Sequence, residues 1–250
     1  EKKISKIKET DQNQEMILSY KEGYKALDKN DTYYAAQKFL EAELLFPQSV
    51  WAPKSALMAA YSYYLQNYFG DAVAELERFI KVYPKHENLD YAYFLLATAH
   101  YEQIINEKKD LGFLLDAKKN FLIVMKNFPK TDYAIDAKFK LDLIDDTLAS
   151  KEMYIGRYYL QQKKWISAIN RFRTVVDDYQ TTIYIEEALH RLVEIYYIIG
   201  LKDEAQKYAN LLGYNYQSSE WYEKSYKIFN KNYVKETIEK NKKIKKTTLE

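Results

Sequence analysis

The chain has 250 residues, and its 38 basic and 36 acidic side chains leave a net charge of +2. This balance excludes the strong positive field of a nucleic-acid-binding protein, and the absence of Cys excludes disulfides and thiolate metal sites. Six Gly and four Pro are too few to supply the turns of a many-stranded sheet, so the composition favours helices.

Five short signals divide the chain. Each is an aromatic residue, then Pro or Gln, then, two positions later, Ser, Thr or His. They are residues 46–49, 83–86, 128–131, 179–182 and 216–219. Pro cannot continue a helix and Ser or Thr can cap the next one, so each signal predicts a helix stop followed by a helix start. His86 stands at a capping position, which indicates a structural role.

Small and large side chains recur at fixed distances before these signals. Twelve residues before each Pro or Gln stands Ala, at 35, 72, 117, 168 and 205. Eight before stand Phe39, Leu76, Phe121, Phe172 and Ala209, and twenty-four before stand Gly23, Ala60, Gly156 and Val193. Small residues on both helices of a pair let the two backbones approach closely, while the large ones fill the space beside them.

The spacing predicts an all-α fold, a tetratricopeptide-like helical-repeat solenoid of five helix pairs plus a C-terminal capping helix. We expect one elongated repeat domain, 1–250, with repeats at about 16–49, 50–86, 90–131, 132–182 and 183–219. A capping helix at 219–239 and a basic tail at 240–250 follow. The tail is expected to be solvated, or to contact an acidic partner or anionic lipid.

Intervals of 45 and 51 residues exceed the 34-residue unit of this repeat class, so two insertions are expected. One is a loop at about 106–112 inside repeat three, and the other is a single long helix over about 132–161.

No reactive constellation occurs in the sequence. His86, His100 and His190 lie in different repeats, and no phosphate-binding Gly-rich loop or nucleophile motif is present. We therefore expect no enzymatic activity, no metal site and no cofactor.

The first helix of each pair in such an array lines the concave side, and here those positions are mainly aromatic. The expected substrate groove consists of Tyr20, Tyr24, Leu57, Tyr61, Tyr64, Tyr91, Phe94 and Tyr101. Tyr combines apolar area with a hydroxyl, which suits extended peptides that carry aromatic or aliphatic side chains. The alternative is that individual rings only pack between successive helices.

Two longer strings are more specific than the generic repeat. They are Arg78-Phe79-Ile80-Lys81-Val82-Tyr83-Pro84-Lys85-His86-Glu87-Asn88-Leu89-Asp90-Tyr91-Ala92-Tyr93 and Trp165-Ile166-Ser167-Ala168-Ile169-Asn170-Arg171. With the insertion in repeat three and the long helix after it, they make the chain resemble the BamD family, lipoproteins of the bacterial outer-membrane barrel-assembly machine. The resemblance extends over nearly the whole chain.

The resemblance implies a scaffold on the periplasmic face of the outer membrane, lipid-anchored through an N-terminal Cys that is absent from this chain. It implies binding of BamA periplasmic domains through the C-terminal repeats, of unfolded outer-membrane proteins through the N-terminal repeats, and of other barrel-assembly lipoproteins. Arg171 matches the family's BamA-contacting Arg. Its alternative role is an ion pair within the repeat, with Asp177 or Asp178.

Two other interpretations remain open from the sequence. The chain could be another periplasmic tetratricopeptide adaptor, of the kind that links cell-wall synthesis to envelope constriction, or a cytosolic adaptor. The chain begins at Glu1 rather than Met, which is compatible with removal of a leader segment.

Overall fold

The computed structural model of the chain describes residues 9–103, 111–217 and 219–230. Within these residues the structure has eleven α-helices and no strand, which confirms the predicted all-α fold of five helix pairs and a C-terminal helix. The chain divides into two compact units, Glu1–Leu141 and Asp142–Glu250. The joining of all five pairs into one elongated domain stays a prediction.

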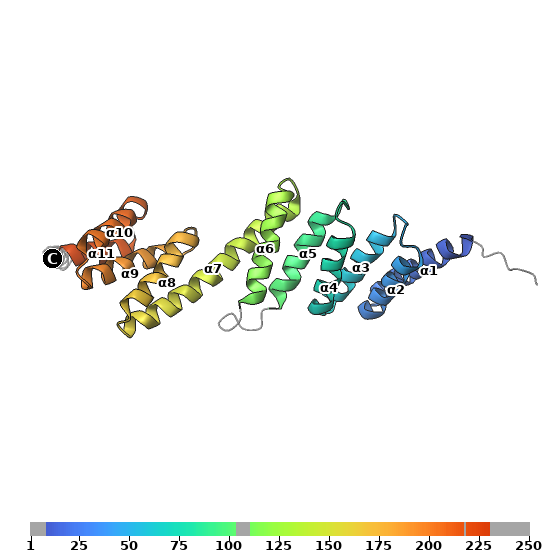
Figure 1. Cartoon of the computed structure of the whole chain (residues 1–250), viewed down its shortest axis with the longest axis horizontal. Coiled ribbons are helices and arrows are strands. Elements are labelled where there is room, and N and C mark those ends of the chain that lie inside the picture. Colours follow the sequence, from blue (N-terminus) through green and yellow to red (C-terminus); the bar gives the residue numbers. More distant parts are fainter. Residues whose placement is uncertain (1–8, 104–110, 218, 231–250) are drawn as a thin grey trace, which may run out of the picture. The chain divides into compact units, whose positions relative to one another are not determined.

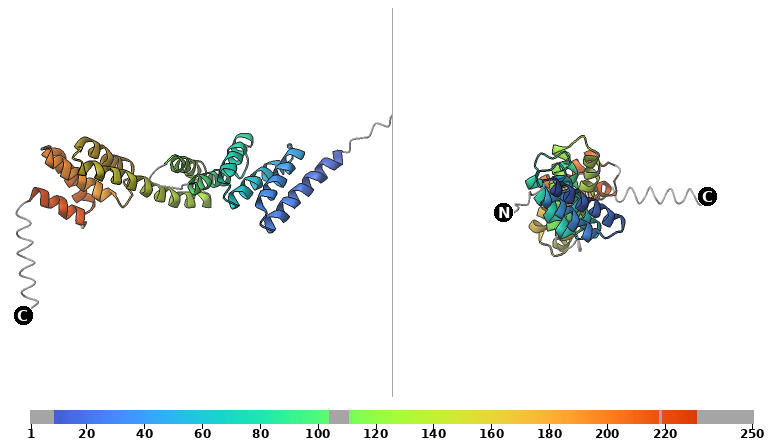
Figure 2. Two further views of the ribbon diagram at one scale, coloured as in Figure 1. Left: turned by 90° about the horizontal axis from the view of Figure 1, so that it is seen from below. Right: turned by 90° about the vertical axis from the view of Figure 1, so that its right-hand side faces the viewer.

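Unit 1 contains the first three helix pairs and the start of the long helix (Figure 1). Its helices are α1 (Glu9–Asp28), α2 (Thr32–Leu45), α3 (Ala52–Leu65), α4 (Phe69–Val82), α5 (Leu89–Glu102), α6 (Gly112–Asn127) and the first part of α7 (Asp132–Gln161). From α1 to α6 each helix packs against the next in chain order, an arrangement that Figure 2 shows from a second direction.

Unit 2 contains the rest of α7 with its pair partner, the fifth helix pair and the C-terminal helix. Its other helices are α8 (Trp165–Asp178), α9 (Ile185–Ile198), α10 (Lys202–Asn215) and α11 (Glu220–Phe229). Helix α9 packs on α8, α10 and α11, so it lies at the centre of the unit. The 132–161 helix is confirmed. The predicted loop at 106–112, the last residues of the capping helix and the basic tail fall mostly or wholly outside the described residues.

Close contacts between small and large side chains join the two helices of a pair. The five Ala residues found twelve positions before the signals are all fully buried, as are Phe39 and Phe172. A Cβ built on Gly23 would lie 2.9 Å from the ring of Phe39, and one built on Gly156 would lie 2.7 Å from the ring of Phe172. These glycines therefore set the distance between the helices, as the spacing predicts.

The turns inside the first, second, fourth and fifth helix pairs follow a rule that the sequence reasoning missed. Among the described residues, four have positive φ, namely Asn30, Asn67, Lys163 and Gly200, and each stands 17 positions before the Pro or Gln of the next corner. In each turn the next residue donates its N–H to a carbonyl five positions back, for example Asp31 to Ala26 at 2.9 Å and Leu201 to Tyr196 at 2.9 Å. This is the Schellman ending of a helix, which favours Gly or Asn.

The corners between helix pairs use their hydroxyls in two ways. Ser49 and Ser219 accept backbone N–H groups from the following helix, as predicted for caps. Thr131 and Thr182 instead donate back to the carbonyl of the aromatic residue three positions earlier. His86 accepts the N–H of Asn88 at Nδ1.

Candidate peptide-binding site

One hollow in unit 1 brings together five of the eight residues expected to form the substrate groove. It has a volume of about 370 Å³ and lies against α1, α3 and the corner that joins α4 to α5. Its lining is Tyr20, Tyr24, Lys54, Leu57, Met58, Tyr61, His86, Glu87, Asn88 and Tyr91. We call this the tyrosine hollow.

Tyr20 lies at the centre of an aromatic cluster on one side of the tyrosine hollow. Its ring meets the rings of Tyr24, Trp51 and Phe39 edge to face, with centroids 5.2, 5.1 and 5.3 Å away. Burial and the hydrogen bond to Tyr24 raise the pKa of Tyr20, so its hydroxyl stays protonated. Edge-to-face contacts of this kind fix the orientation of the rings before any ligand arrives.

Tyr24 and Met58 form the more open part of the hollow. The Tyr24 hydroxyl donates to the Met58 sulfur at 3.8 Å, and its side chain is 43% exposed. A thioether is polarisable and adapts its shape, so Met58 can accommodate ligand side chains of different outline.

Leu57, Tyr61 and Tyr91 form the opposite side. Leu57 is buried, and both Tyr rings are half-buried beside it. Burial raises the pKa of Tyr91, with a further contribution from Tyr61, so this hydroxyl is also neutral. The ring of Tyr91 also contacts that of Tyr133 on α7, with centroids 5.4 Å apart and the planes tilted by 46°, which limits its movement.

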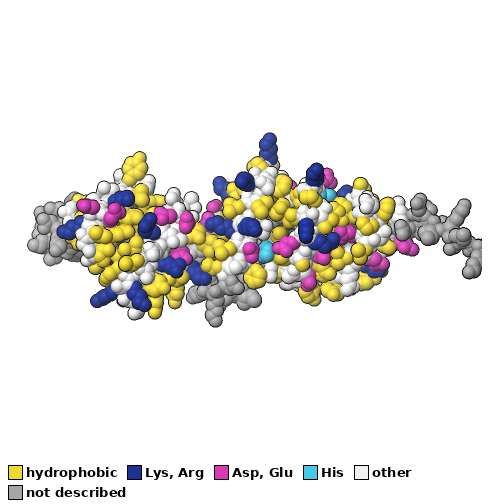
Figure 3. Space-filling model, viewed as in Figure 1, with side chains coloured by type: hydrophobic (Ala, Val, Ile, Leu, Met, Phe, Trp, Pro, Cys, Tyr) yellow, Lys and Arg dark blue, Asp and Glu magenta, His cyan; other side chains and the backbone are white. Residues whose placement is uncertain are grey.

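The rim of the tyrosine hollow is polar and carries both signs of charge. The Lys54 ammonium lies 5.5 Å above the ring of Trp51, and Glu87 is exposed on the corner. His86 accepts the Asn88 N–H at Nδ1, which leaves its other ring nitrogen free to act on a ligand. In Figure 3 basic and acidic side chains are interspersed over the face of unit 1 in view. Side chains of the rim can therefore hydrogen-bond to backbone N–H and C=O groups of a ligand. Because both signs of charge are present, the rim has no broad electrostatic field.

Three of the expected groove residues do not line the hollow. Tyr64 lies against Phe69, with centroids 5.7 Å apart. Phe94 contacts Phe121 at 5.7 Å and Tyr133 at 5.3 Å. The ring of Tyr101 lies 4.7 Å below the ammonium of Lys140. Each of these rings contacts a neighbouring helix, and a client contact at any of the three stays a prediction.

The sequence reasoning also missed residues of the hollow. Lys54 and Met58 lie on the same face of α3 as Leu57 and Tyr61, and their spacing of three and four residues could have identified them. The corner residues 86–88 gave no such signal, because they come from the end of the preceding repeat and enter the hollow only through the packing of α5 on α3.

Arg171 lies in unit 2, on α8. Its Nη1 donates to both carboxylate oxygens of Glu152 on α7, at 3.2 and 3.1 Å. The ion pair therefore lies within the repeat, but its partner is Glu152, while Asp177 is 3.9 Å from Arg173. A small polar hollow of about 180 Å³ beside Arg171 is lined by Tyr159, Ser167, Asn170 and Thr174.

Among residues 9–103, 111–217 and 219–230, no three His, Asp or Glu side chains are grouped so that they could hold a metal ion. In the same ranges no helix is long and apolar enough to cross a membrane.

Comparison with known proteins identifies relatives over most of the chain. A family model described as YfiO, outer membrane lipoprotein, matches residues 11–211. The outer membrane protein assembly factor BamD of Rickettsia prowazekii is 44% identical over 214 residues, which cover 86% of this chain and 85% of the relative. BamD of Caulobacter vibrioides is 38% identical over 222 residues, which cover 89% and 73%. A solved tetratricopeptide-repeat protein of Thermus thermophilus, TTC0263, aligns with a TM-score of 0.40 and 14% identity, covering 86% and 98%.

Proposed function

The chain belongs to the YfiO family of outer membrane lipoproteins, whose curated relatives are BamD assembly factors, and we propose that it holds unfolded outer-membrane proteins for the barrel-assembly machine. Family membership associates it with the outer membrane and its assembly machinery. The proposal adds that it is a non-catalytic scaffold on the periplasmic face, anchored through an N-terminal lipid. It further adds binding to BamA and to other lipoproteins of the machine.

The observation that carries the client-binding proposal is the tyrosine hollow. Its rings are held edge to face by neighbours, so a client side chain meets a surface that is already ordered and loses little free energy to rearrangement. The neutral hydroxyl of Tyr91 can donate to a backbone carbonyl of an extended segment, and the Tyr20 hydroxyl oxygen can accept a backbone N–H. An aromatic or aliphatic side chain of the client would occupy the space between Tyr24 and Tyr61.

The volume of the tyrosine hollow fits contact with part of an extended client rather than with a folded one. About 370 Å³ is at the lower end of the range for ligand pockets, which leaves room for one or two side chains and not for a folded surface. Such a contact is weak and exchanges quickly, as a protein that passes clients onward requires.

The BamA contact is proposed for unit 2, at Arg171. The side chain of Arg171 is 42% exposed, and only its Nη1 is used by Glu152. Its remaining N–H groups can donate to a partner, and a guanidinium already oriented by a carboxylate loses less entropy when it does so.

The client test replaces Tyr24 and Tyr61 with Ala in the full chain. A fluorescent peptide taken from the last strand of an outer-membrane barrel should bind about tenfold more weakly, because two aromatic contacts are removed. Fluorescence anisotropy gives the affinity, and circular dichroism gives the melting curve, which should change little because Tyr24 is exposed and Tyr61 half-buried.

Tyr154→Ala is the matched control, because Tyr154 is a 66% exposed Tyr of α7 that does not line the tyrosine hollow. Equal peptide affinity in the double variant and the control would remove the hollow from client binding. A large fall of the melting temperature in the double variant would show that these rings serve the fold.

A further inference from the structure

A second hollow in unit 1 lies between α4, α5 and α6 and shares no residue with the tyrosine hollow. It measures about 320 Å³. The residues that matter for its chemistry are Glu77, Tyr93, His100, Asp116, Lys119 and Asn120. We call this the His100 hollow.

His100 of α5 contributes a buried imidazole without a hydrogen-bond partner. The residue is 7% exposed, and its Nδ1 atom is inaccessible to solvent and forms no hydrogen bond. No described residue hydrogen-bonds to the other nitrogen either, so Nε2 is the ring atom that a ligand in the hollow can reach. Nδ1 stays unpaired in the interior, which is unusual for a buried polar atom, so Nε2 is the position at which the ring can gain a hydrogen bond.

The electrostatic surroundings of the imidazole favour a cationic ligand. Burial lowers the pKa of His100, although Asp116 and Glu77 oppose this, so the ring is neutral and offers a lone pair. Asp116 and Glu77 form no ion pair with any described residue, and Lys119 is the one Lys or Arg among the described lining residues. The described part of the lining therefore carries a net charge of −1.

Asn120 adds a further acceptor to the His100 hollow. Asn120 is buried and donates its amide to the backbone carbonyl of Asp116 at 3.0 Å, which leaves its carbonyl oxygen available. Tyr93 and the aliphatic side chains of Ile80 and Ile123 form walls that could cover the methylene stem of a long side chain. The hollow thus offers four hydrogen-bond acceptor groups: two carboxylates, an amide oxygen and an imidazole lone pair. These match a ligand that only donates hydrogen bonds.

We propose that the His100 hollow binds a basic side chain, above all Arg, of a partner polypeptide. A guanidinium has five N–H donors in one plane and can reach several acceptors at once, which a compact ammonium does less well. A bound divalent metal fits less well, because the described residues contain no group of three ligating side chains. The site would add a charge-based contact in unit 1 to the apolar contact of the tyrosine hollow.

The test uses the full chain with isotope-labelled histidine. Only three His are present, so the imidazole signal of His100 can be assigned with His100→Gln. The probe is the peptide acetyl-Gly-Gly-Arg-Gly-Gly-amide, and the matched peptide carries citrulline, which has the shape of Arg without its charge. The His100 signal should shift saturably with the Arg peptide and not with the citrulline peptide, while the His86 and His190 signals stay unchanged.

Asp116→Asn and Glu77→Gln, singly and together, test the charge contribution. The double variant should bind the Arg peptide about fivefold more weakly, since two exposed carboxylates are neutralised. Glu15→Gln, at an exposed position on α1, is the control and should leave the affinity unchanged.

Four results would overturn the proposal. They are an unmoved His100 signal, an equal shift with citrulline, unchanged affinity in the Asp116 and Glu77 variants, or a shift with Mg²⁺ or Ca²⁺ alone at lower concentration than with peptide. The last would identify a metal ion as the ligand.

Discussion

At the residue scale, the packing within a helix pair depends on the lack of a side chain at two points. Gly156 of α7 faces the fully buried ring of Phe172, and Gly23 of α1 faces Phe39 in the same way. Both rings are fully enclosed, so neither can move away without disturbing other neighbours. Packed interiors respond to an added methyl group with strain because they contain few voids.

Gly156→Ala should therefore lower the free energy of unfolding by about 1–3 kcal/mol, since the new Cβ would lie 2.7 Å from Phe172. Urea unfolding followed by circular dichroism measures the change. Gly70→Ala is the matched control, because a Cβ at Gly70 of α4 meets no atom within 4 Å. That substitution should leave stability equal or slightly higher, because Ala is the better helix former. Equal losses in both variants would contradict the steric explanation.

Substitution of Lys163 is predicted to raise the free energy of unfolding rather than lower it. Its φ is +56°, while Asn30 and Asn67 occupy the same place in the first two turns with φ of +61° and +62°. Asn tolerates the left-handed region better than Lys, so Lys163→Asn should raise the free energy of unfolding by about 0.5–1 kcal/mol. Thermal melting in matched buffer checks this, and Lys164→Asn, one position later, should give no such gain.

How far the sequence could predict the structure differs from residue to residue. The offsets identified Gly23, Phe39, Gly156 and Phe172, because a repeat copies its contacts at fixed spacing. The environment of the Phe94 ring could not be predicted from such offsets. Whether its ring faces a groove or its neighbours depends on the side chain that α7 places beside it, and that side chain is Tyr133, 39 positions later.

At the element scale, the docking of α11 on α9 is the clearest example of one helix closing the apolar face of another. His190 of α9 hydrogen-bonds to the buried Ser225 at 2.8 Å, and its ring lies 5.2 Å from that of Trp221. The Lys224 ammonium lies over the Trp221 ring, 4.1 Å from its centroid. The helix begins at the Ser219 cap, as predicted.

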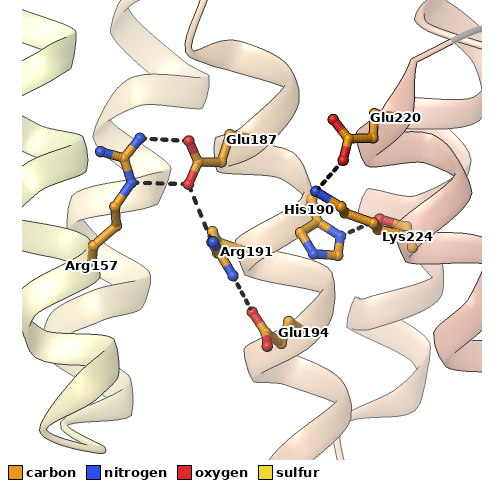
Figure 4. A network of polar contacts seen from close by, with 8 residues as sticks. Arg157, Glu187, His190, Arg191, Glu194, Glu220 and Lys224 are labelled. Atoms are coloured by element: carbon orange, nitrogen blue, oxygen red, sulfur yellow. Dashed lines mark hydrogen bonds and ion pairs between the residues drawn. The ribbon is translucent and has the colours of Figure 1, made fainter.

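A network of charged side chains lies next to this contact. Glu187 accepts from Arg157 of α7 at 2.9 Å and from Arg191 at 3.3 Å, and Arg191 also donates to Glu194 (Figure 4). Burial alone would raise the pKa of Glu187, but the two arginines outweigh it and hold that pKa below its usual value. The sequence does not reveal this network, because Arg157 and Glu187 are 30 positions apart and meet only through packing.

The His190 contact should make unit 2 sensitive to acid. Burial lowers the pKa of His190 from 6.5 to about 4; Arg191 and Lys224 add to the shift, and Glu194 and Glu187 oppose it. The unfolded chain therefore binds a proton between pH 6.5 and 4 that the folded chain does not. The stability contributed by neutral His190 is complete above pH 6.5 and is lost as the pH falls toward 4, by a total on the order of 3 kcal/mol.

Urea unfolding at pH 7 and pH 5 tests this, followed by Trp221 fluorescence in a chain with Trp51 and Trp165 replaced by Phe. His190→Gln keeps a hydrogen-bonding group near Ser225 but cannot titrate, so its stability should change less between the two pH values. Glu187 is present in both proteins, so the difference between them isolates His190. The same pH dependence in both would assign the effect to other groups.

At the scale of the whole molecule, each unit has its own buried core. Phe39, Leu76 and Phe79 are fully buried in unit 1, and Phe172, Leu189 and Leu192 are buried in unit 2. The two proposed binding functions follow the same division. Every residue of the tyrosine hollow belongs to unit 1, and Arg171 with its polar hollow belongs to unit 2.

This division predicts that the two functions can be removed independently. Substitutions that share no partners usually add, so Tyr24→Ala with Tyr61→Ala should weaken only the client peptide, and Arg171→Glu should weaken only BamA periplasmic domains. The combined variant should show both losses at their separate sizes. Arg173→Glu, two residues from Arg171 on the same helix and 51% exposed in its side chain, is the control for added negative charge.

Peptide affinity is then measured by anisotropy with and without saturating BamA domains. Independent sites require the same peptide affinity in both conditions, whereas a change would have to be matched by an equal change in BamA affinity when peptide is bound. A reciprocal change of that kind would contradict independent units. It would mean that occupation of one unit alters the other, and α7 contributes residues to both.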